Sequence, residues 1–313
     1  MSSTVSPMRE QYIPPPVGWQ RRVARYLGRD WLLGYGLLLP VLLVMIGLVA
    51  YPFVYSFWLS MQQKQLGGEA TFVFLDNFIY LLGNADFQQA AINSFIYTIV
   101  GVGMKFLLGL AMALVLNSAI KARNFWRALL FIPWSIPIVV TAFTWRWMYD
   151  DLNGVFNTIL ARLGIIDRYI FWLGNPDIAL WAVIVAMIWQ GTPFYCMNFL
   201  AGLQSIPREL YDAAKIDGAN RVQEFWHITI PGLFSVILIT LLLSTIWTAN
   251  EMQFVYILTQ GGPLNATQIY PHYAYEMSIK LRQLGLGAAI PLMFFPFLVA
   301  IIVVLTRRLL KQE

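Results

Sequence analysis

Apolar residues gather in six long segments separated by polar stretches, and this pattern sets the first expectation for the fold. The segments lie at 32–58, 90–117, 128–148, 178–203, 231–250 and 284–306. Each is long enough for a transmembrane helix, which needs roughly 20 predominantly apolar residues. We therefore expect an all-α membrane protein with six transmembrane helices.

The stretch 204–231, between the fourth and fifth segments, carries seven charges among its 28 residues. Charge of this density cannot lie in lipid, so the stretch is a water-exposed loop. Pro207 suits a first helical turn, and Gly218 suits a left-handed helix stop. Asn220 and Gln223 can then form a capping box that starts a second helix. The sequence predicts a helix–turn–helix at the membrane surface, where it suits docking of a soluble partner.

The positive charges predict the orientation of the chain. Fourteen of the 21 Lys and Arg residues fall in the N-terminal tail, the 118–127 loop, the 204–230 loop and the C-terminus, and five fall in the other loops. Loops rich in Lys and Arg stay in the cytoplasm, so both termini are expected there. We expect a cytoplasmic tail with a basic surface helix over 1–30, a six-span domain over 31–310 and a cytoplasmic C-terminus over 311–313.

Composition excludes several other classes of protein. The chain is 58% hydrophobic and 12% charged, whereas an ordinary soluble domain carries about 25% charged residues. Its net charge of +5 follows from the loop charges and does not predict nucleic-acid binding. The single cysteine excludes an internal disulfide. Because phosphate-binding loops, metal-ligand spacings and clustered catalytic residues are missing from the sequence, we expect no catalytic residue, metal or cofactor on this chain.

The fourth and fifth segments hold the candidate binding residues. Gly191 and Pro193 predict a kink or an opening in the fourth helix. Residues on one face of the fifth helix are polar apart from one large aromatic: Thr240, Ser244, Trp247, Thr248 and Glu251. Rings beside hydroxyl and amide groups suit a sugar, although ordinary interhelical hydrogen bonds explain the stripe equally well. Glu251 either binds a hydroxyl or lies at the external interface.

Lys105 lies within the second segment, where an ionisable side chain points to a functional site. Of the two interpretations, we favour a lysine buried against a neighbouring helix or a water-filled cleft.

Particular spacings resemble those of ATP-binding-cassette (ABC) import permeases. Asp212-Ala213-Ala214, Gly218, Ile228 and Pro231 match the spacing of the EAA motif of that family, with Asp in place of the usual Glu and Ile230 in place of the usual Leu. The segment from Trp189 to Phe194 and the turn from Thr259 to Pro263 resemble the carbohydrate permeases of the maltose and glycerol-phosphate type. The resemblance covers roughly residues 30–310.

This resemblance implies a type I ABC importer permease, half of the translocation pathway, in a bacterial or archaeal cytoplasmic membrane. It implies a second related permease, two ATPase subunits that bind ATP and Mg²⁺, and an extracytoplasmic sugar-binding protein as partners. The residues implied to couple to the ATPase lie in the 207–228 helix–turn–helix, and they are Glu209, Asp212, Ala213, Ala214, Asp217 and Gly218. The residues implied to bind the sugar are Gln190, Gly191, Phe194, Ser244, Trp247, Thr248 and Glu251.

An ion-coupled secondary transporter is the alternative. Such a protein normally shows an internal repeat and acidic residues within its spans, and neither is evident in the sequence. The identity of the sugar stays open, although Glu251 would repel a phosphorylated substrate and so favours a neutral one.

Overall fold

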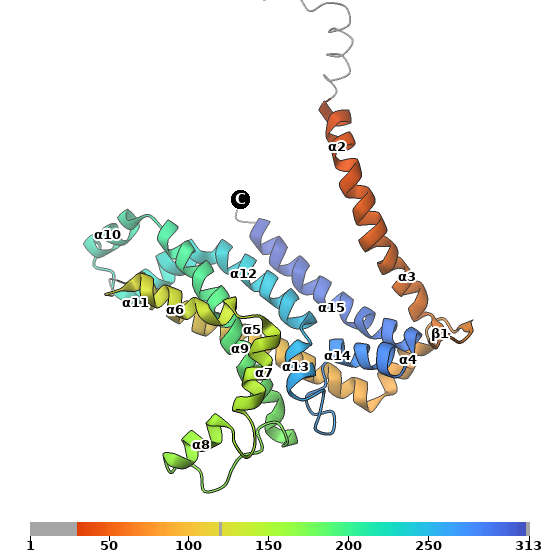
Figure 1. Ribbon diagram of the computed structural model, residues 1–313. Helices are drawn as coiled ribbons and strands as arrows, with labels where there is room; N and C mark the ends of the chain where they lie inside the picture. Colours follow the sequence, from red (N-terminus) through yellow and green to blue (C-terminus); the bar gives the residue numbers. More distant parts are fainter. Residues whose placement is uncertain (1–29, 119–120, 311–313) are drawn as a thin grey trace, which may run out of the picture. The chain divides into compact units, whose positions relative to one another are not determined.

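The computed structural model describes residues 30–118 and 121–310, which fold mainly into helices (Figure 1). The chain divides into two compact units, with the boundary between Ser56 and Phe57. The first unit contains α2 (Asp30–Met45), the π-helix η1 (Ile46–Ala50) and the start of α3 (Tyr51–Ser60). With the rest of α3, these elements form an apolar helix over Gly34–Ser60 that is long enough to cross a membrane. The tail before residue 30 and residues 311–313 lie outside the described residues.

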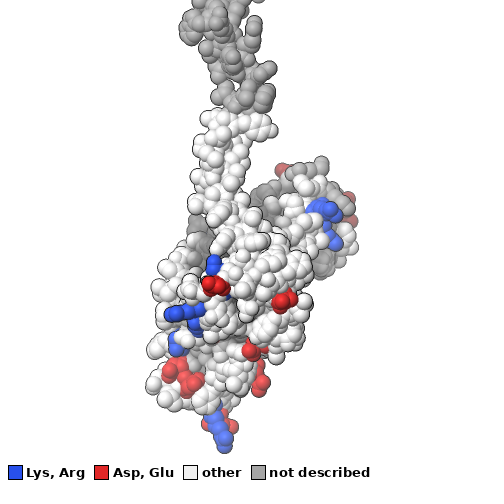
Figure 2. All heavy atoms as spheres, turned by 90° about the vertical axis from the view of Figure 1, so that its right-hand side faces the viewer, with Lys and Arg blue, Asp and Glu red and all other residues white. Residues whose placement is uncertain are grey.

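The second unit contains four further apolar helices of spanning length. They are α5 (Ala85–Asn117), α9 (Pro176–Ser205), the stretch Arg221–Leu258 that includes α12 (Ile230–Asn250), and α15 (Leu284–Leu310). These confirm the predicted helices at 90–117, 178–203, 231–250 and 284–306, each of which the structure extends at one or both ends. Figure 2 shows a face on which most described atoms belong to uncharged residues, as expected for a protein surrounded by lipid.

The predicted span over 128–148 is not one straight helix. The structure breaks it into α6 (Arg123–Ser135) and α7 (Ile138–Met148), which meet at 91°. Pro137 disfavours a helical backbone at the preceding residue, and Ile136 is indeed extended, with φ −79° and ψ 132°. The pair can still count as one bent span, which gives up to six spans in the described part of the chain.

A kink or an opening was predicted for the fourth span, and of these two the opening is wrong, because α9 stays α-helical through Gly191 and Pro193. Packing explains this: α9 is the most buried of the apolar helices and contacts α5 along its length. The contact is close, since a Cβ atom on Gly109 of α5 would lie 2.3 Å from the Cβ of Tyr195 on α9. A helix packed this tightly tolerates the loss of the backbone hydrogen bond that proline cannot donate.

Shorter elements connect the spans. They are the antiparallel strands β1 (Gln62–Lys64) and β2 (Ala70–Phe72), and the helices α4 (Asp76–Gly83), α8 (Val155–Arg162), α10 (Arg208–Ile216), α11 (Arg221–Glu224), η2 (Phe225–Thr229), α13 (Gln253–Leu258), α14 (Tyr270–Tyr275) and η3 (Glu276–Lys280). In the hairpin of β1 and β2, Gln63 pairs with Thr71.

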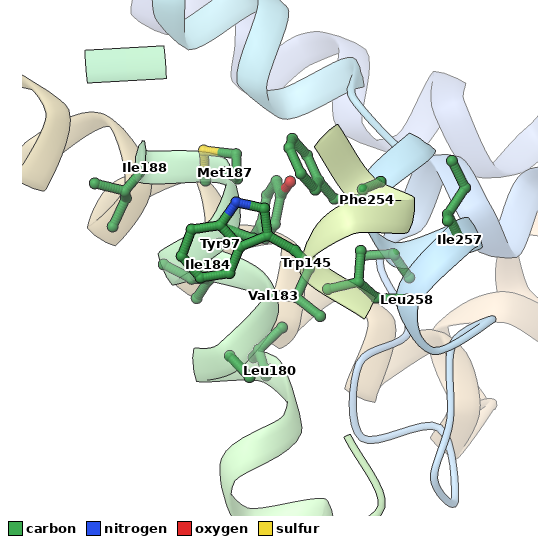
Figure 3. Packing of buried hydrophobic residues seen from close by; sticks show 14 of the residues in the cluster. Tyr97, Trp145, Leu180, Val183, Ile184, Met187, Ile188, Phe254, Ile257 and Leu258 are labelled. Atoms are coloured by element: carbon green, nitrogen blue, oxygen red, sulfur yellow. The ribbon is translucent and has the colours of Figure 1, made fainter. Parts of the chain in front are cut away.

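Three buried apolar clusters hold the second unit together. The largest joins α5, α7, α9 and α13, and in Figure 3 Tyr97, Trp145, Met187 and Phe254 converge from these four helices. A second cluster packs around Tyr195 and Phe199 near the 204–231 loop, and a third includes Phe294 of α15. The first two clusters fix α9 against its neighbours on either side of the polar residues described next.

Candidate functional site

One cavity of about 270 Å³ is lined by all seven residues that the resemblance implied for substrate binding. Three come from α9, three from α12 and one from the residue after α12: Gln190, Gly191, Phe194, Ser244, Trp247, Thr248 and Glu251. Their role in binding stays a prediction, but the fold does bring them together. The structure adds five lining residues that the sequence did not assign to this site: Lys105, Trp134, Ile138, Met187 and Phe254.

Three aromatic rings form an apolar wall of the cavity. Trp134 of α6 stacks on Phe194 of α9, with ring centroids 5.1 Å apart and planes inclined by 26°. Phe194 contacts Trp247 of α12 at 5.2 Å, and Trp247 contacts Trp134 at 6.3 Å. Trp247 remains 48% exposed and Trp134 36% exposed, so both rings keep free surface. Rings with free faces stack on the C–H faces of sugars or on other flat, partly apolar ligands.

A polar wall lies on the side of α5. Lys105 is 5% exposed, and its Nζ donates a hydrogen bond of 2.7 Å to Oγ1 of Thr248. Gly191 makes room for this lysine, because a Cβ atom there would lie 2.6 Å from Lys105 Cδ. The sequence signal for Lys105 was its charge inside an apolar segment. Its partner stayed hidden, since Thr248 lies 143 residues further along the chain.

Glu251 joins the end of α12 to α13. Its Oε1 accepts hydrogen bonds from the backbone N–H groups of Gln253 and Phe254, the latter at 3.1 Å. Its Oε2 accepts a hydrogen bond of 2.6 Å from the hydroxyl of Tyr97 on α5. The carboxylate therefore helps to start α13 and ties it to α5, while it also lines the cavity. The two roles proposed for it from sequence did not include this one.

The helix–turn–helix predicted between the fourth and fifth spans is confirmed. Gly218 has φ +80° directly after α10, and a capping box of Asn220 and Gln223 starts α11. Pro207 precedes α10 as its N-terminal cap residue, one position earlier than expected. We call residues 204–231 the coupling loop, after the role that the resemblance implies.

None of the α10 residues is buried. Leu210 is 51% exposed and Ile216 87% exposed. The acidic and small residues implied to contact an ATPase lie on this same exposed segment: Glu209, Asp212, Ala213, Ala214, Asp217 and Gly218. Exposed apolar side chains rimmed by charges are typical of a protein interface. The hydroxyls of Tyr211 and Thr229, 3.0 Å apart, connect α10 to η2 at the base of the loop.

Within residues 30–118 and 121–310, no group of three or more His, Cys, Asp or Glu side chains is arranged to hold a metal ion. Cys196 is buried among apolar side chains of α9 and its neighbours. Burial also lowers the pKa of His272, which lies outside the spans.

Comparison with known proteins gives the family. Residues 105–312 match the family described as binding-protein-dependent transport system inner membrane component. The chain belongs to this family. The trehalose/maltose transport system permease protein MalF of Thermococcus litoralis is 36% identical over 277 residues, which cover 88% of this chain and 93% of that protein. The sulfoquinovosyl glycerol transport system permease protein SmoG of Agrobacterium fabrum is 30% identical over 269 residues, covering 85% and 86% of the two chains.

Solved structures of ABC transporters contain chains with a similar fold. A bacterial ABC transporter involved in the import of the acidic polysaccharide alginate contains a chain that superposes with a TM-score of 0.78 at 23% identity, covering 93% of this chain and 99% of that chain. The MetNI methionine ABC transporter gives a TM-score of 0.54 at 15% identity. Membership of this family and the similarity to MalF make the chain a multi-pass permease component of an ABC importer, which is a transport subunit and not an enzyme. Family membership favours this function over the ion-coupled transporter.

Proposed function

We propose that this chain is the permease subunit of an ATP-driven sugar importer and that the sugar crosses the membrane through the cavity between α5, α6, α9 and α12. The observation that carries the proposal is the cavity itself, in which three aromatic rings face hydroxyl, amide and charged groups. A sugar stacks its C–H faces on rings and needs hydrogen-bond partners for its hydroxyls. The relatives MalF and SmoG are permeases of the trehalose/maltose and sulfoquinovosyl glycerol transport systems, and both support the same substrate class.

The coupling loop is the proposed site for an ATPase subunit. Its two helices are attached to α9 on one side and to α12 on the other. Helices α9 and α12 carry six of the seven predicted substrate residues, and the seventh, Glu251, directly follows α12. A displacement of α10 would therefore act on both helices that line the cavity. The hydroxyl contact between Tyr211 and Thr229 would make α10 and the start of α12 move together.

The proposed assembly contains a second, related permease, two ATPase subunits below and an extracytoplasmic sugar-binding protein above. A single chain supplies only part of a pathway, so the second permease would complete it. ATP and Mg²⁺ would be bound by the ATPase subunits. The proposed location is the cytoplasmic membrane of a bacterium or archaeon, with the coupling loop on the cytoplasmic side, as the excess of Lys and Arg in that loop and the terminal segments predicts.

The test is transport by the whole assembly in proteoliposomes. The permease pair, the ATPases and the binding protein are reconstituted together, and uptake of labelled neutral and acidic sugars is measured with ATP inside or outside the vesicles. The proposal predicts uptake of at least one sugar that requires ATP on the side of the coupling loop and the binding protein on the other side. Uptake that follows an ion gradient without ATP would instead establish a secondary transporter.

A further inference from the structure

We propose that Lys105 is a specificity-determining residue of the sugar cavity, where it donates hydrogen bonds to the substrate while its charge is balanced by Glu251, so that the cavity selects an uncharged sugar. This inference rests on the proposed function and adds a residue from α5 that neither the family resemblance nor the sequence assigned. The observation behind it is the presence of both charged side chains on the wall of one cavity.

Burial makes the position of Lys105 significant. The side chain lies within a membrane-spanning helix and is 5% exposed. An ammonium group has three N–H donors and no acceptor. Lys105 Nζ uses one donor in its hydrogen bond of 2.7 Å to Thr248 Oγ1. Among the described residues, this is the hydrogen bond that Lys105 makes. Two donors are then left for an acceptor inside the cavity, and sugar hydroxyl and ring oxygens are such acceptors.

Glu251 has less capacity left than Lys105. Its two carboxylate oxygens already accept three hydrogen bonds, from the backbone of Gln253 and Phe254 and from Tyr97. A carboxylate offers about four lone-pair sites, so most are occupied before substrate arrives. We assign Glu251 to charge balance and to the placement of α13, and we assign the direct contact to Lys105.

The two charges are held in fixed positions by the same pair of helices. On α5, Tyr97 binds Glu251 and Lys105 binds Thr248, so that two hydrogen bonds join α5 to the end of α12. Among the lining residues they are the two that carry charge, one of each sign.

Balanced charge decides the substrate class. Because both charges line the same cavity, an acidic sugar would be attracted by Lys105 and repelled by Glu251. The net attraction would offset little of the free energy that the sugar's carboxylate loses with its hydration. A neutral sugar avoids that cost and still receives two charge-assisted hydrogen bonds. The proximity of Lys105 to Gly191 also indicates that this glycine serves the lysine, because any larger side chain would displace it.

The test uses the complete transporter in proteoliposomes with its binding protein, and the probes are glucose, maltose, trehalose and maltotriose beside glucuronate and dimannuronate. The wild type is expected to take up a neutral probe and to reject the acidic ones. Lys105→Met removes the ammonium group and keeps an unbranched side chain one atom shorter. It should lower the ratio of maximal rate to KM for that probe at least about tenfold, because hydrogen bonds to charged groups are worth that much. Lys280→Met is the matched control, since Lys280 pairs with Glu276 outside the spans, and it should leave the ratio unchanged.

Charge balance is tested by Glu251→Gln, which keeps an acceptor oxygen for α13. It should also lower uptake, whereas the double variant Lys105→Met/Glu251→Gln should lose less than the product of the two single losses. Losses that multiply would show that the two side chains act independently, without charge balance between them. Co-purification of the partner subunits reports on assembly, and if Lys105→Met does not assemble, Lys105→Gln replaces it in the same comparison.

The outcomes separate the two proposals. If the wild type takes up none of the probes, the sugar importer itself is overturned. If it takes up a neutral sugar but Lys105→Met behaves like Lys280→Met, or the single losses multiply in the double variant, only the role of Lys105 is overturned. Preferential uptake of glucuronate or dimannuronate would overturn the charge-balance argument.

Discussion

The coupling loop and the cavity are built in opposite ways. The loop is a run of consecutive residues whose shape comes from local signals, namely Gly218 at φ +80° and the capping box that starts α11. The cavity is assembled from residues as far apart in sequence as Lys105 and Phe254, which packing of separate helices brings together. Within the loop, α10 has no buried residue, and its Leu210 and Ile216 are 51% and 87% exposed, whereas the cavity residues Ser244 and Thr248 are both 4% exposed.

This difference implies a division of function. An exposed loop that is attached to α9 and α12 can transmit a force without touching the substrate. A cavity lined by fixed rings and charges can select a substrate without touching an ATPase. Changes in the loop should therefore affect the rate of transport for every substrate, and changes in the cavity should affect affinity and choice.

The largest effect is expected for Gly218→Val. A β-branched residue at φ +80° costs about 1–3 kcal/mol of local strain, so the turn between α10 and α11 should rearrange. We expect ATP-driven uptake to fall at least about tenfold and the ATPase to be lost from the purified complex, because disruption of an interface core commonly costs about 2 kcal/mol or more.

Gly164→Val is the matched control. Gly164 also has a left-handed backbone, with φ +68°, and a Cβ atom at either glycine would meet nothing within 4 Å. The two variants thus carry the same kind of strain, but Gly164 lies after α8, away from the coupling loop. Equal loss of the ATPase in both variants would show that strain as such, and not the loop, is responsible.

A smaller effect is expected for Trp247→Ala. Loss of one face of the aromatic wall should raise KM for the sugar several-fold to about tenfold, because aromatic contacts are worth about 0.5–1.5 kcal/mol beyond their buried area. Trp181→Ala is the control, since Trp181 on α9 is 49% exposed, against 48% for Trp247, but does not line the cavity. An unchanged KM for Trp247→Ala would remove this ring from the proposed site.

The smallest effect is expected for Gly191→Ala. The added Cβ would lie 2.6 Å from Lys105 Cδ, and the flexible lysine can shift to relieve the contact at the expense of its place in the cavity. We expect KM to rise about two- to fivefold, since the lost interaction is a fraction of one hydrogen bond. Gly103→Ala on α5, where a Cβ meets nothing within 4 Å, should leave KM unchanged. Similar KM values for Gly191→Ala and Gly103→Ala would contradict the proposed position of Lys105 beside Gly191.

The sequence predicted the coupling loop well because its signals act over a few residues. Glycine at a left-handed position and an Asn–Gln capping box have local causes, and the structure contains both. The predicted substrate residues on α9 and α12 could be grouped for a related reason, since helical periodicity places them on common faces.

Long-range packing was not predictable in the same way, and two prolines illustrate this. Pro137 ends a helix with a 91° bend, whereas Pro193 lies within a continuous α9. The residue type is the same, and the difference is that α9 is enclosed by α5 and α12. The unexpected bend between α6 and α7 accompanies the position of Trp134 on the cavity wall. Lys105 lines the same cavity from α5, a helix that the sequence did not connect to Thr248.

The most direct test of this account is a measurement of KM and maximal rate for ATP-driven sugar uptake by Gly218→Val and Trp247→Ala in the same proteoliposome preparation. We expect Gly218→Val to lower the maximal rate and leave KM unchanged, and Trp247→Ala to raise KM and leave the coupling between ATP hydrolysis and uptake intact. If both variants change the same parameter in the same direction, the division between a coupling loop and a selective cavity is contradicted.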